Sequence, residues 1–197
     1  MISNETGLEY GGIKDGYLIA ATQCPSPNAN QRPQGQPVNL LVIHNISLPP
    51  GQFGTGCVQA FFTNQLNISQ DSYFQTIAEL QVSAHFFIER DGCIKQFVSL
   101  GARAWHAGAS SFHGVANCND YSIGIELEGC DDIAYTDDQY NALLKVTQQV
   151  RAVYPQITAE RIVGHNQIAP GRKTDPGEAF DWVRFRQLLS GSHNDNV

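Results

Sequence analysis

The chain has 197 residues, with 12 lysines and arginines against 19 aspartates and glutamates, so its net charge is −7 when histidine is neutral. This length fits one domain that buries about 70% of its unfolded surface and needs no disulfide or metal to fold. With 42% hydrophobic and only 16% charged residues, the composition excludes a disordered chain. The acidic balance argues against a general nucleic-acid-binding protein. We find neither heptads nor an internal repeat, which excludes coiled-coil and solenoid folds.

The N-terminal sequence lacks the features of an export signal, namely a basic start followed by an apolar stretch of signal-peptide length. No run of 18 apolar residues is present, so a membrane span is not expected. The five cysteines are scattered without a C-x-x-C pair, which favours free thiols in a reducing compartment. We therefore expect a cytoplasmic protein with no membrane and no nucleic-acid partner.

The first half of the chain predicts an irregular lead-in followed by strands and short helices. Residues 24–37 are rich in proline, asparagine and glutamine, which is typical of irregular structure. The apolar residues 38–43 predict a strand that is buried on both faces and ends at His44. Helices are expected over residues 57–66 and 70–80, and a hairpin at Asp91-Gly92.

A long loop and an alternating strand follow the hairpin. Residues 103–121 are rich in glycine, alanine and serine, and the length of this segment favours a functional loop over a simple connection. Polar and apolar side chains alternate over residues 121–129, which predicts a strand with two different faces. One face carries Ile123, Ile125 and Leu127, and the other carries Gly124, Glu126 and Glu128.

The last third of the chain predicts two helices and one more strand. Thr136 is a typical N-cap, and the apolar spacing after it indicates a helix that continues to Val153. A strand-like run over residues 161–164 ends at His165, and a short amphipathic helix is expected over residues 180–189. Strands and helices mixed in this order predict a mixed α/β (α+β) fold, in which helices flank a central mixed sheet.

Two histidines have the same position relative to predicted strands. His44 and His165 each end a buried strand and lead into a loop that contains proline and glycine. If these strands are parallel neighbours, both imidazoles lie at one edge of the sheet, where open α/β folds place their sites. Two imidazoles and one carboxylate can hold zinc and leave a fourth position for water. The alternative is two loop histidines without a common role, and no H-E-x-x-H helix is present.

Asp175 is the candidate for the carboxylate. It lies ten residues after His165, and Pro176 favours an extended backbone that can direct the Asp175 carboxylate back toward that histidine. Arg172 and Lys173 make the same loop locally basic. The alternatives are an ordinary Asp-Pro-Gly turn and a solvated basic surface.

Glu126 and Glu128 share one face of an otherwise apolar strand. A carboxylate in a half-buried strand must be paired, near a metal or raised in pKa, and this is a suitable position for a general base. The alternative is a strand edge whose glutamates face solvent. His85 and His106 are expected to be packed, hydrogen-bonded histidines rather than metal ligands.

Five stretches of the chain, taken together, resemble a known protein family. They are LLVIHNISLPPGQFG, SAHFFIERDG, RAWHAGASSFHG, CNDYSIGIELEG and IVGHNQIAPGRKTDPG. Together they resemble the amidase-2 family of N-acetylmuramoyl-L-alanine amidases, which includes the peptidoglycan recognition proteins. The resemblance implies a recognition protein-like single domain over residues 37–190, with an extension (residues 1–36) packed on or leading into it and a flexible tail (residues 191–197).

The resemblance also implies a role for individual residues. One zinc ion per chain would be bound by His44, His165 and Asp175. Glu126 takes the position of the general base, and Lys173 that of the cation that stabilises the transition state. Asn45, Trp105 and Arg172 match positions near the anhydromuramyl group of the substrate. Recognition proteins typically have cysteine where this chain has Asp175, so the aspartate favours the branch of the family that acts in cell-wall recycling.

The implied function is hydrolysis of the lactyl–L-Ala amide of 1,6-anhydro-N-acetylmuramyl peptides during cytoplasmic peptidoglycan recycling, which bears on induction of the AmpC β-lactamase. The expected partner is this small-molecule substrate, and the expected state is a monomer. Because the substrate is anionic, Arg172, Lys173 and Arg161 are expected to make the pocket locally basic. Two alternatives are a phage-type or exported amidase that acts on intact peptidoglycan, and a non-catalytic peptidoglycan-binding module.

Overall fold

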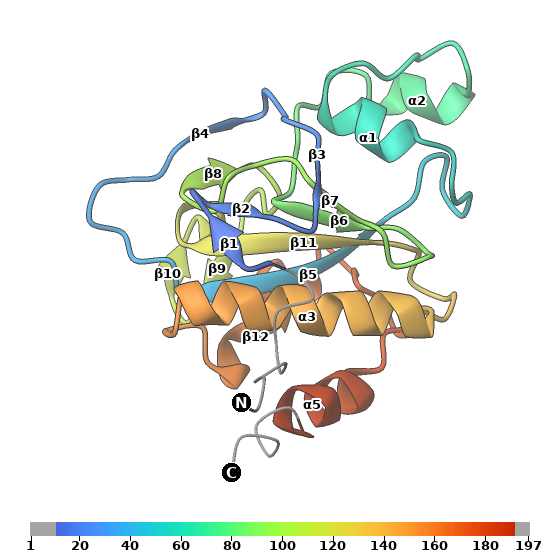
Figure 1. Ribbon diagram of the computed structural model, residues 1–197. Coiled ribbons are helices and arrows are strands. Elements are labelled where there is room, and N and C mark those ends of the chain that lie inside the picture. Colours follow the sequence, from blue (N-terminus) through green and yellow to red (C-terminus); the bar gives the residue numbers. More distant parts are fainter. Residues whose placement is uncertain (1–10, 192–197) are drawn as a thin grey trace.

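A mixed sheet forms the centre of the protein (Figure 1). In the computed structural model, which describes residues 11–191, its six strands lie in the order β12 (Ile162–Gly164), β5 (Leu40–Ile46), β11 (Ser122–Glu128), β6 (Phe86–Ile88), β7 (Ile94–Gln96) and β3 (Thr22–Gln23). The first four are parallel, whereas β7 is antiparallel to β6 and parallel to β3. The predicted mixed sheet is therefore confirmed.

Short strands and helices surround this sheet. Three two-stranded sheets pair β1 (Ile13–Lys14) with β2 (Tyr17–Leu18), β4 (Ala29–Gln31) with β8 (Ala102–Ala104), and β9 (Ser111–Phe112) with β10 (Val115–Ala116). The helices are α1 (Cys57–Phe62), α2 (Ser72–Thr76), α3 (Asp137–Val153), α4 (His165–Ile168), α5 (Trp182–Gly191) and the 3-10 turns η1 (Cys118–Asp120) and η2 (Ala159–Arg161). Among residues 11–191, no helix is both long enough and apolar enough to cross a membrane.

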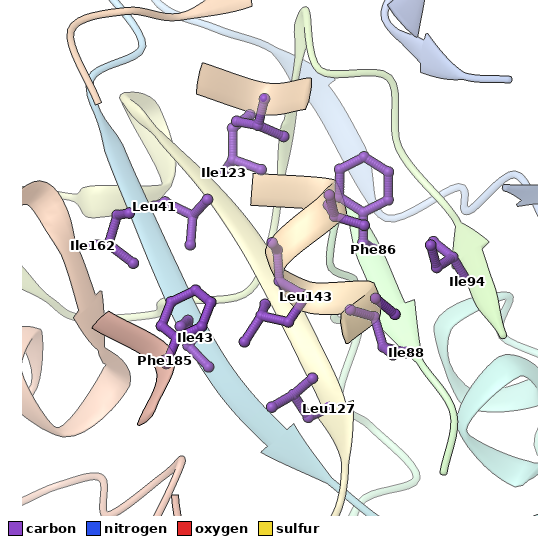
Figure 2. Close-up of a cluster of buried hydrophobic side chains, with 14 of the residues drawn as sticks. Leu41, Ile43, Phe86, Ile88, Ile94, Ile123, Leu127, Leu143, Ile162 and Phe185 are labelled. Atoms are coloured by element: carbon purple, nitrogen blue, oxygen red, sulfur yellow. The ribbon is translucent and has the colours of Figure 1, made fainter. Parts of the chain in front are cut away.

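The period of two along the central strands gives the sheet two different faces. On one face, Leu41 and Ile43 of β5 pack with Leu143 of α3 and Phe185 of α5 in the largest apolar cluster (Figure 2). On the other face, Leu40 and Val42 belong to a separate, smaller cluster. Both faces are covered, which explains why the central strands are almost continuously apolar.

The second face carries the polar residues of β11. Ile123, Ile125 and Leu127 lie in the large core, as predicted, so Ser122, Gly124, Glu126 and Glu128 alternate onto the opposite face. The parallel register places Glu126 directly beside His44 of β5. All seven residues of β11 are buried, so the alternative of solvent-facing glutamates is wrong.

Local signals explain where the helices begin and end. The predicted α3 is confirmed, with a capping box between Thr136 and Gln139, although Val153 at its end is 46% exposed. The first two helices are shorter than predicted. The α1 helix ends at Phe62, because Asn64 adopts the left-handed conformation with φ 58°. The hairpin at Asp91-Gly92 is confirmed, and Gly92 supplies the required positive φ of 82°.

Residues 11–36 are in contact with the rest of the fold rather than standing apart from it. Leu18 is fully buried in the large core, and β3 forms an edge of the central sheet. The guanidinium of Arg32 donates to the carbonyls of Leu100, Asn119, Asp120 and Ser122. The division into extension, domain and tail stays a prediction, and all of the predicted tail except Gly191 lies outside the described residues.

Candidate active site

Three side chains from three elements meet at the carboxyl end of the parallel strands. His44 lies on β5, His165 is the first residue of α4 directly after β12, and Asp175 follows α4. His44 Nδ1, His165 Nδ1 and Asp175 Oδ2 are each 3.0 Å from the other two. The predicted ligands are thus brought together, although β5 continues to Ile46 instead of ending at His44, and His165 begins a helix rather than a loop.

The local sequence explains this convergence. Because β12 and β5 are parallel and Gly164 pairs with Ile43, the next residue, His165, lies beside His44. A Cβ on Gly164 would lie 2.8 Å from Pro176 Cδ, so only glycine lets the loop after Asp175 pack this closely. The Asn166 N–H also donates to the Asp175 carbonyl at 3.0 Å. The loop therefore returns the Asp175 carboxylate to the histidines, as predicted.

The chemistry of these three groups suits a divalent metal ion. His165 Nε2 is 3.0 Å from the Ala107 carbonyl, which can only accept, so Nε2 carries the ring proton and the Nδ1 lone pair faces the cluster. Burial lowers the pKa of His44 to about 4, so this ring is neutral. Asp175 Oδ2 lies 3.0 Å from both Nδ1 atoms, so three groups that can each offer an electron pair to a metal ion converge here. Two neutral imidazoles and one carboxylate form a typical zinc donor set.

Glu126 is the buried carboxylate next to this cluster. Its side chain is only 8% exposed, and Oε2 has no hydrogen-bond partner among the described residues. Burial and then the charge of Asp175 raise the pKa of Glu126 well above its ordinary value of 4.5, while Lys173 opposes this shift. An uncompensated carboxyl group with a raised pKa has the properties of a general base.

Glu128 has a different role, although it lies on the same face of β11. Its carboxylate accepts hydrogen bonds from the Gly54 N–H at 2.6 Å and the Arg90 N–H at 3.1 Å. Both acceptor oxygens are therefore occupied by backbone groups of two loops. Of the two glutamates that the sequence left as candidates, only Glu126 is available for proton transfer.

The site opens into a cavity of about 840 Å³. One part of its lining is apolar and comes from the segment of α1 and α2, including Phe61 and Ile77. Another part is polar and includes Glu126, Lys173 and two of the predicted ligands, His165 and Asp175. The cavity therefore offers both apolar contact area and converging polar groups, as binding sites for small molecules usually do.

Two of the three predicted basic residues line this cavity. Lys173 is exposed, and no hydrogen bond or ion pair holds its ammonium group within the described part of the chain. Arg172 Nη2 donates to the carbonyls of Ala107 and Ala109, at 2.7 Å each. The expectation for Arg161 is wrong, because its guanidinium binds the backbone of Asn39 and does not line the cavity between residues 11 and 191.

The two remaining candidates differ in position. Asn45 lines the cavity and donates from Nδ2 to Asp131 Oδ1 at 2.9 Å; Asp131 also lines the cavity and was not predicted. Trp105 is not part of the lining in the described chain, and its indole N–H donates to Asn30 at 2.9 Å. Its backbone N–H donates to Ser83, which does line the cavity.

His106 is a packed, hydrogen-bonded histidine, as predicted, but its contact with His44 was not predicted: its ring nitrogen Nδ1 lies 2.9 Å from His44 Nε2. One signal for it was present. Gly124 interrupts a buried strand, and a Cβ there would lie 2.5 Å from His106 Cγ. Glycine inside a strand often marks a place where another group approaches the backbone closely.

Residues 34–178 match the family model described as N-acetylmuramoyl-L-alanine amidase. The chain belongs to this amidase family. The amidase is 52% identical over 178 residues to the 1,6-anhydro-N-acetylmuramyl-L-alanine amidase AmpD of Escherichia coli K12, which covers 90% of this chain and 97% of the relative. It is 50% identical over 173 residues to the AmpD of Haemophilus influenzae, covering 88% and 94% of the two chains.

Solved structures agree with this assignment. A crystal structure of a selenomethionine AmpD derivative matches with a TM-score of 0.88 at 52% identity, over 90% of this chain and 98% of that one. The E. coli amidase AmiD, in complex with anhydro-N-acetylmuramic acid-L-Ala-D-gamma-Glu-L-Lys, matches with a TM-score of 0.57 at 30% identity, over 80% and 60%. Drosophila peptidoglycan recognition protein SD shares the fold at 20% identity, with a TM-score of 0.55 over 83% and 87%. The predicted fold class is confirmed.

Proposed function

We propose that this amidase hydrolyses the lactyl–L-Ala amide of 1,6-anhydro-N-acetylmuramyl peptides, with zinc as its cofactor. The observation that carries the proposal is the cluster of His44, His165 and Asp175 beside the buried Glu126. The substrate class is supported by the names of relatives that are about half identical over nearly the whole chain. AmiD, which was solved with such a compound, also has the same fold.

One zinc ion would be held by Nδ1 of His44, Nδ1 of His165 and Oδ2 of Asp175. When bound, zinc supplies a Lewis acid, which can polarise the scissile carbonyl and bring the pKa of water toward about 7. The protein residues supply the rest of the chemistry, because none of the three ligands is free to transfer a proton.

Glu126 would move the proton. It accepts a proton from water as the water oxygen attacks the amide carbon, and it donates a proton to the L-Ala nitrogen as the C–N bond breaks. The raised pKa of Glu126 suits both steps, because a carboxyl group with an ordinary pKa would be a poor proton donor near neutral pH.

Lys173 would stabilise the negative charge that develops on the tetrahedral oxygen. Its ammonium group lines the cavity and is near enough to Glu126 and His44 to shift the pKa of both. Loss of one such group typically costs about 3–4 kcal/mol of transition-state stabilisation, so Lys173→Ala should lower kcat several-hundredfold while zinc content stays unchanged. Lys14→Ala, outside the cavity, is the control, and retention of turnover in Lys173→Ala would exclude this role.

Substrate binding would use Arg172 and Asn45 in the cavity, with Trp105 at its side. A cationic guanidinium suits an anionic muropeptide, and Asn45 has an amide that can bind sugar or peptide oxygens. We also propose a cytoplasmic monomer. All five cysteines lie in the described part of the chain and none forms a disulfide, which supports a reducing compartment.

Metal content and turnover, measured together, test the proposal. Zinc per chain is determined for the wild type, Asp175→Ala and Asp132→Asn, a control with an exposed aspartate of the cavity. Each protein is assayed on anhydromuramyl-tripeptide and on intact sacculi. We expect one zinc and cleavage of the soluble substrate in the wild type and control, and neither in Asp175→Ala.

The other outcomes separate the alternatives. Cleavage of sacculi without cleavage of the soluble substrate would favour an amidase of the intact wall. Binding of muropeptide without zinc or cleavage would favour a binding module, and the roles given to Glu126 and Lys173 would be lost with the proposal.

A further inference from the structure

A chain of hydrogen bonds leads from His44 to the protein backbone. His44 Nε2 is 2.9 Å from His106 Nδ1, His106 Nε2 is 3.1 Å from Ser122 Oγ, and Ser122 Oγ is 2.6 Å from the Cys118 carbonyl. The side chains are almost wholly buried, with His44 1%, His106 8% and Ser122 0% exposed. None of these contacts takes part in the proposed catalysis.

The direction of every hydrogen bond in this series follows from the Cys118 carbonyl at its end. The Cys118 carbonyl can only accept, so it takes the single hydroxyl proton of Ser122. Ser122 Oγ must then accept from His106 Nε2–H. A neutral imidazole has one donor and one acceptor, so His106 Nδ1 accepts from His44 Nε2–H. The remaining nitrogen, His44 Nδ1, is left with its lone pair toward His165 and Asp175.

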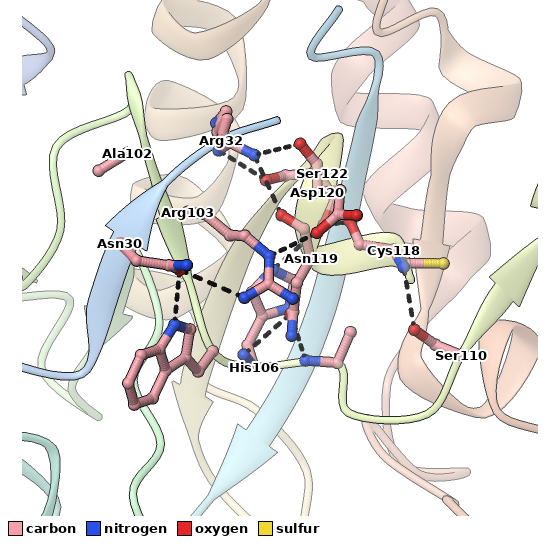
Figure 3. A network of polar contacts seen from close by, with 12 residues as sticks. Asn30, Arg32, Ala102, Arg103, His106, Ser110, Cys118, Asn119, Asp120 and Ser122 are labelled. Atoms are coloured by element: carbon pink, nitrogen blue, oxygen red, sulfur yellow. Dashed lines mark hydrogen bonds and ion pairs between the residues drawn. The ribbon is translucent and has the colours of Figure 1, made fainter. Parts of the chain in front are cut away.

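Hydrogen bonds and close packing hold His106 in place, so its ring can fix the direction of the hydrogen bond from His44. Asn119 Oδ1 accepts from the backbone N–H groups of His106 at 3.1 Å and Ala107 at 2.8 Å (Figure 3). The imidazole lies against Gly124, where a Cβ would be 2.5 Å from the ring. Gly124 and Ser122 both belong to β11, which pairs in parallel with the strand that carries His44. The strand pair thus fixes His106 relative to His44.

The two imidazoles of the cluster are fixed in different ways. His165 donates directly to the Ala107 carbonyl, a backbone group that no substitution removes. His44 depends on two side chains, His106 and Ser122, to reach a backbone acceptor. The structure therefore contains one ligand whose protonation pattern can be changed by mutation at a distance from the metal site.

We propose that His106 and Ser122 are positioning residues, which hold His44 in the tautomer with the proton on Nε2 and with Nδ1 directed at the metal site. This inference rests on the proposed function, because it assumes that His44 binds zinc through Nδ1. Groups of this kind around zinc ligands typically change metal affinity by about 10–100-fold.

The test measures zinc affinity and the His44 tautomer in the same set of variants. Zinc affinity is determined by competition between the zinc-loaded protein and a chromophoric chelator, and the tautomer is read from the ¹⁵N chemical shifts of the ring nitrogens. His106→Leu removes the acceptor for His44, whereas His106→Asn places an amide oxygen close to the position of Nδ1. Ser122→Ala keeps His106 but removes the group that orients it. Thr147→Val is the control, because Thr147 is equally buried but lies in α3, where its hydroxyl has no hydrogen-bond partner among the described residues.

We expect zinc affinity to fall about 10–100-fold in His106→Leu, with loss of the single Nε2–H tautomer of His44. His106→Asn should restore most of the affinity, Ser122→Ala should lose several-fold, and Thr147→Val should keep both properties. If His106→Leu does not fold, Ser122→Ala decides. Unchanged affinity and an unchanged tautomer in Ser122→Ala relative to Thr147→Val, with His106→Leu unchanged or unfolded, would overturn the proposal.

The two readouts distinguish this proposal from the proposed function. If the wild type bound no zinc, the proposed function would fail. The tautomer of His44 would still report whether His106 and Ser122 control this ring. A mixture of both tautomers in the wild type would refute the inference, even in an enzyme that binds zinc and is fully active.

Discussion

The two faces of the β5–β11 pair differ sharply, although alternate residues of the same two strands form both of them. One face packs Ile43 and Ile123 against α3 and α5 in a dry apolar core. The other face carries His44, Glu126 and Ser122, which are all buried. Each has a polar group that either forms a hydrogen bond or destabilises the fold by lacking one. The contrast indicates that one face stabilises the fold and the other carries the residues to which we assign the proposed chemistry.

The largest expected effect is a loss of turnover after substitution on the face that carries His44, Glu126 and Ser122. Glu126→Gln keeps the shape of the side chain but cannot accept a proton, so kcat should fall by about 10²–10⁴. Zinc content should remain at the wild-type value, because Glu126 is not a ligand. Steady-state kinetics with metal analysis checks this, and a variant that retained most of its turnover would remove Glu126 from the mechanism.

A substitution on the apolar face should have the opposite signature. Leu143→Ala in α3 removes a fully buried side chain from the large core and should lower the free energy of unfolding by about 2–5 kcal/mol. Urea unfolding measures this loss. The kcat of the fraction that remains folded should be unchanged, and a large loss of kcat would show that the two faces are not separable.

The buried Glu126 should also make the metal-free protein sensitive to pH. Since burial raises the pKa of Glu126 in the folded state, its contribution to stability is fully present below the ordinary value of 4.5 and is lost as pH rises through the raised pKa. Each unit of that elevation costs about 1.4 kcal/mol at higher pH. Glu126→Gln should remove this loss, so chelator-treated Glu126→Gln should melt at a higher temperature than wild type at pH 7 but not at pH 4.

The smallest effect distinguishes the two glutamates of β11. Glu128→Gln keeps one acceptor oxygen for Gly54 or Arg90 but loses the charge, and it should cost about 1 kcal/mol of stability. Thermal unfolding and kcat are measured side by side with those of Glu126→Gln. A loss of turnover in Glu128→Gln as large as in Glu126→Gln would contradict the division of roles between these two residues.

Much of this arrangement could be predicted from the sequence, because it depends on local periodicity. The alternation around Ile125 fixed which face Glu126 would occupy, and the strand pattern before His44 and His165 placed both at one edge of the sheet. The approach of Asp175 to these histidines was predicted from the extended backbone that Pro176 favours. These are short-range effects that one segment can encode.

The rest depends on contacts between distant segments, which no local pattern records. His106 reaches His44 by lying against β11, where Gly124 leaves room for the ring. Arg161 is the last residue of a 3-10 turn and binds Asn39, although its charge suggested that it would line the pocket. Trp105 is held at the side of the cavity by Asn30, a residue of the segment that looked irregular.

The anchoring of Arg32 has a consequence for truncation of this chain. The family match begins at residue 34, so a protein trimmed to that match would lose a guanidinium that donates to the carbonyls of Asn119 and Ser122. These two residues also hold His106 in place. A shortened protein would therefore keep His44, His165, Asp175 and Glu126, yet the residues that hold His106 would have lost their hydrogen bonds from Arg32. The stretch that matches the family model is therefore shorter than the stretch whose contacts hold the proposed active site in place.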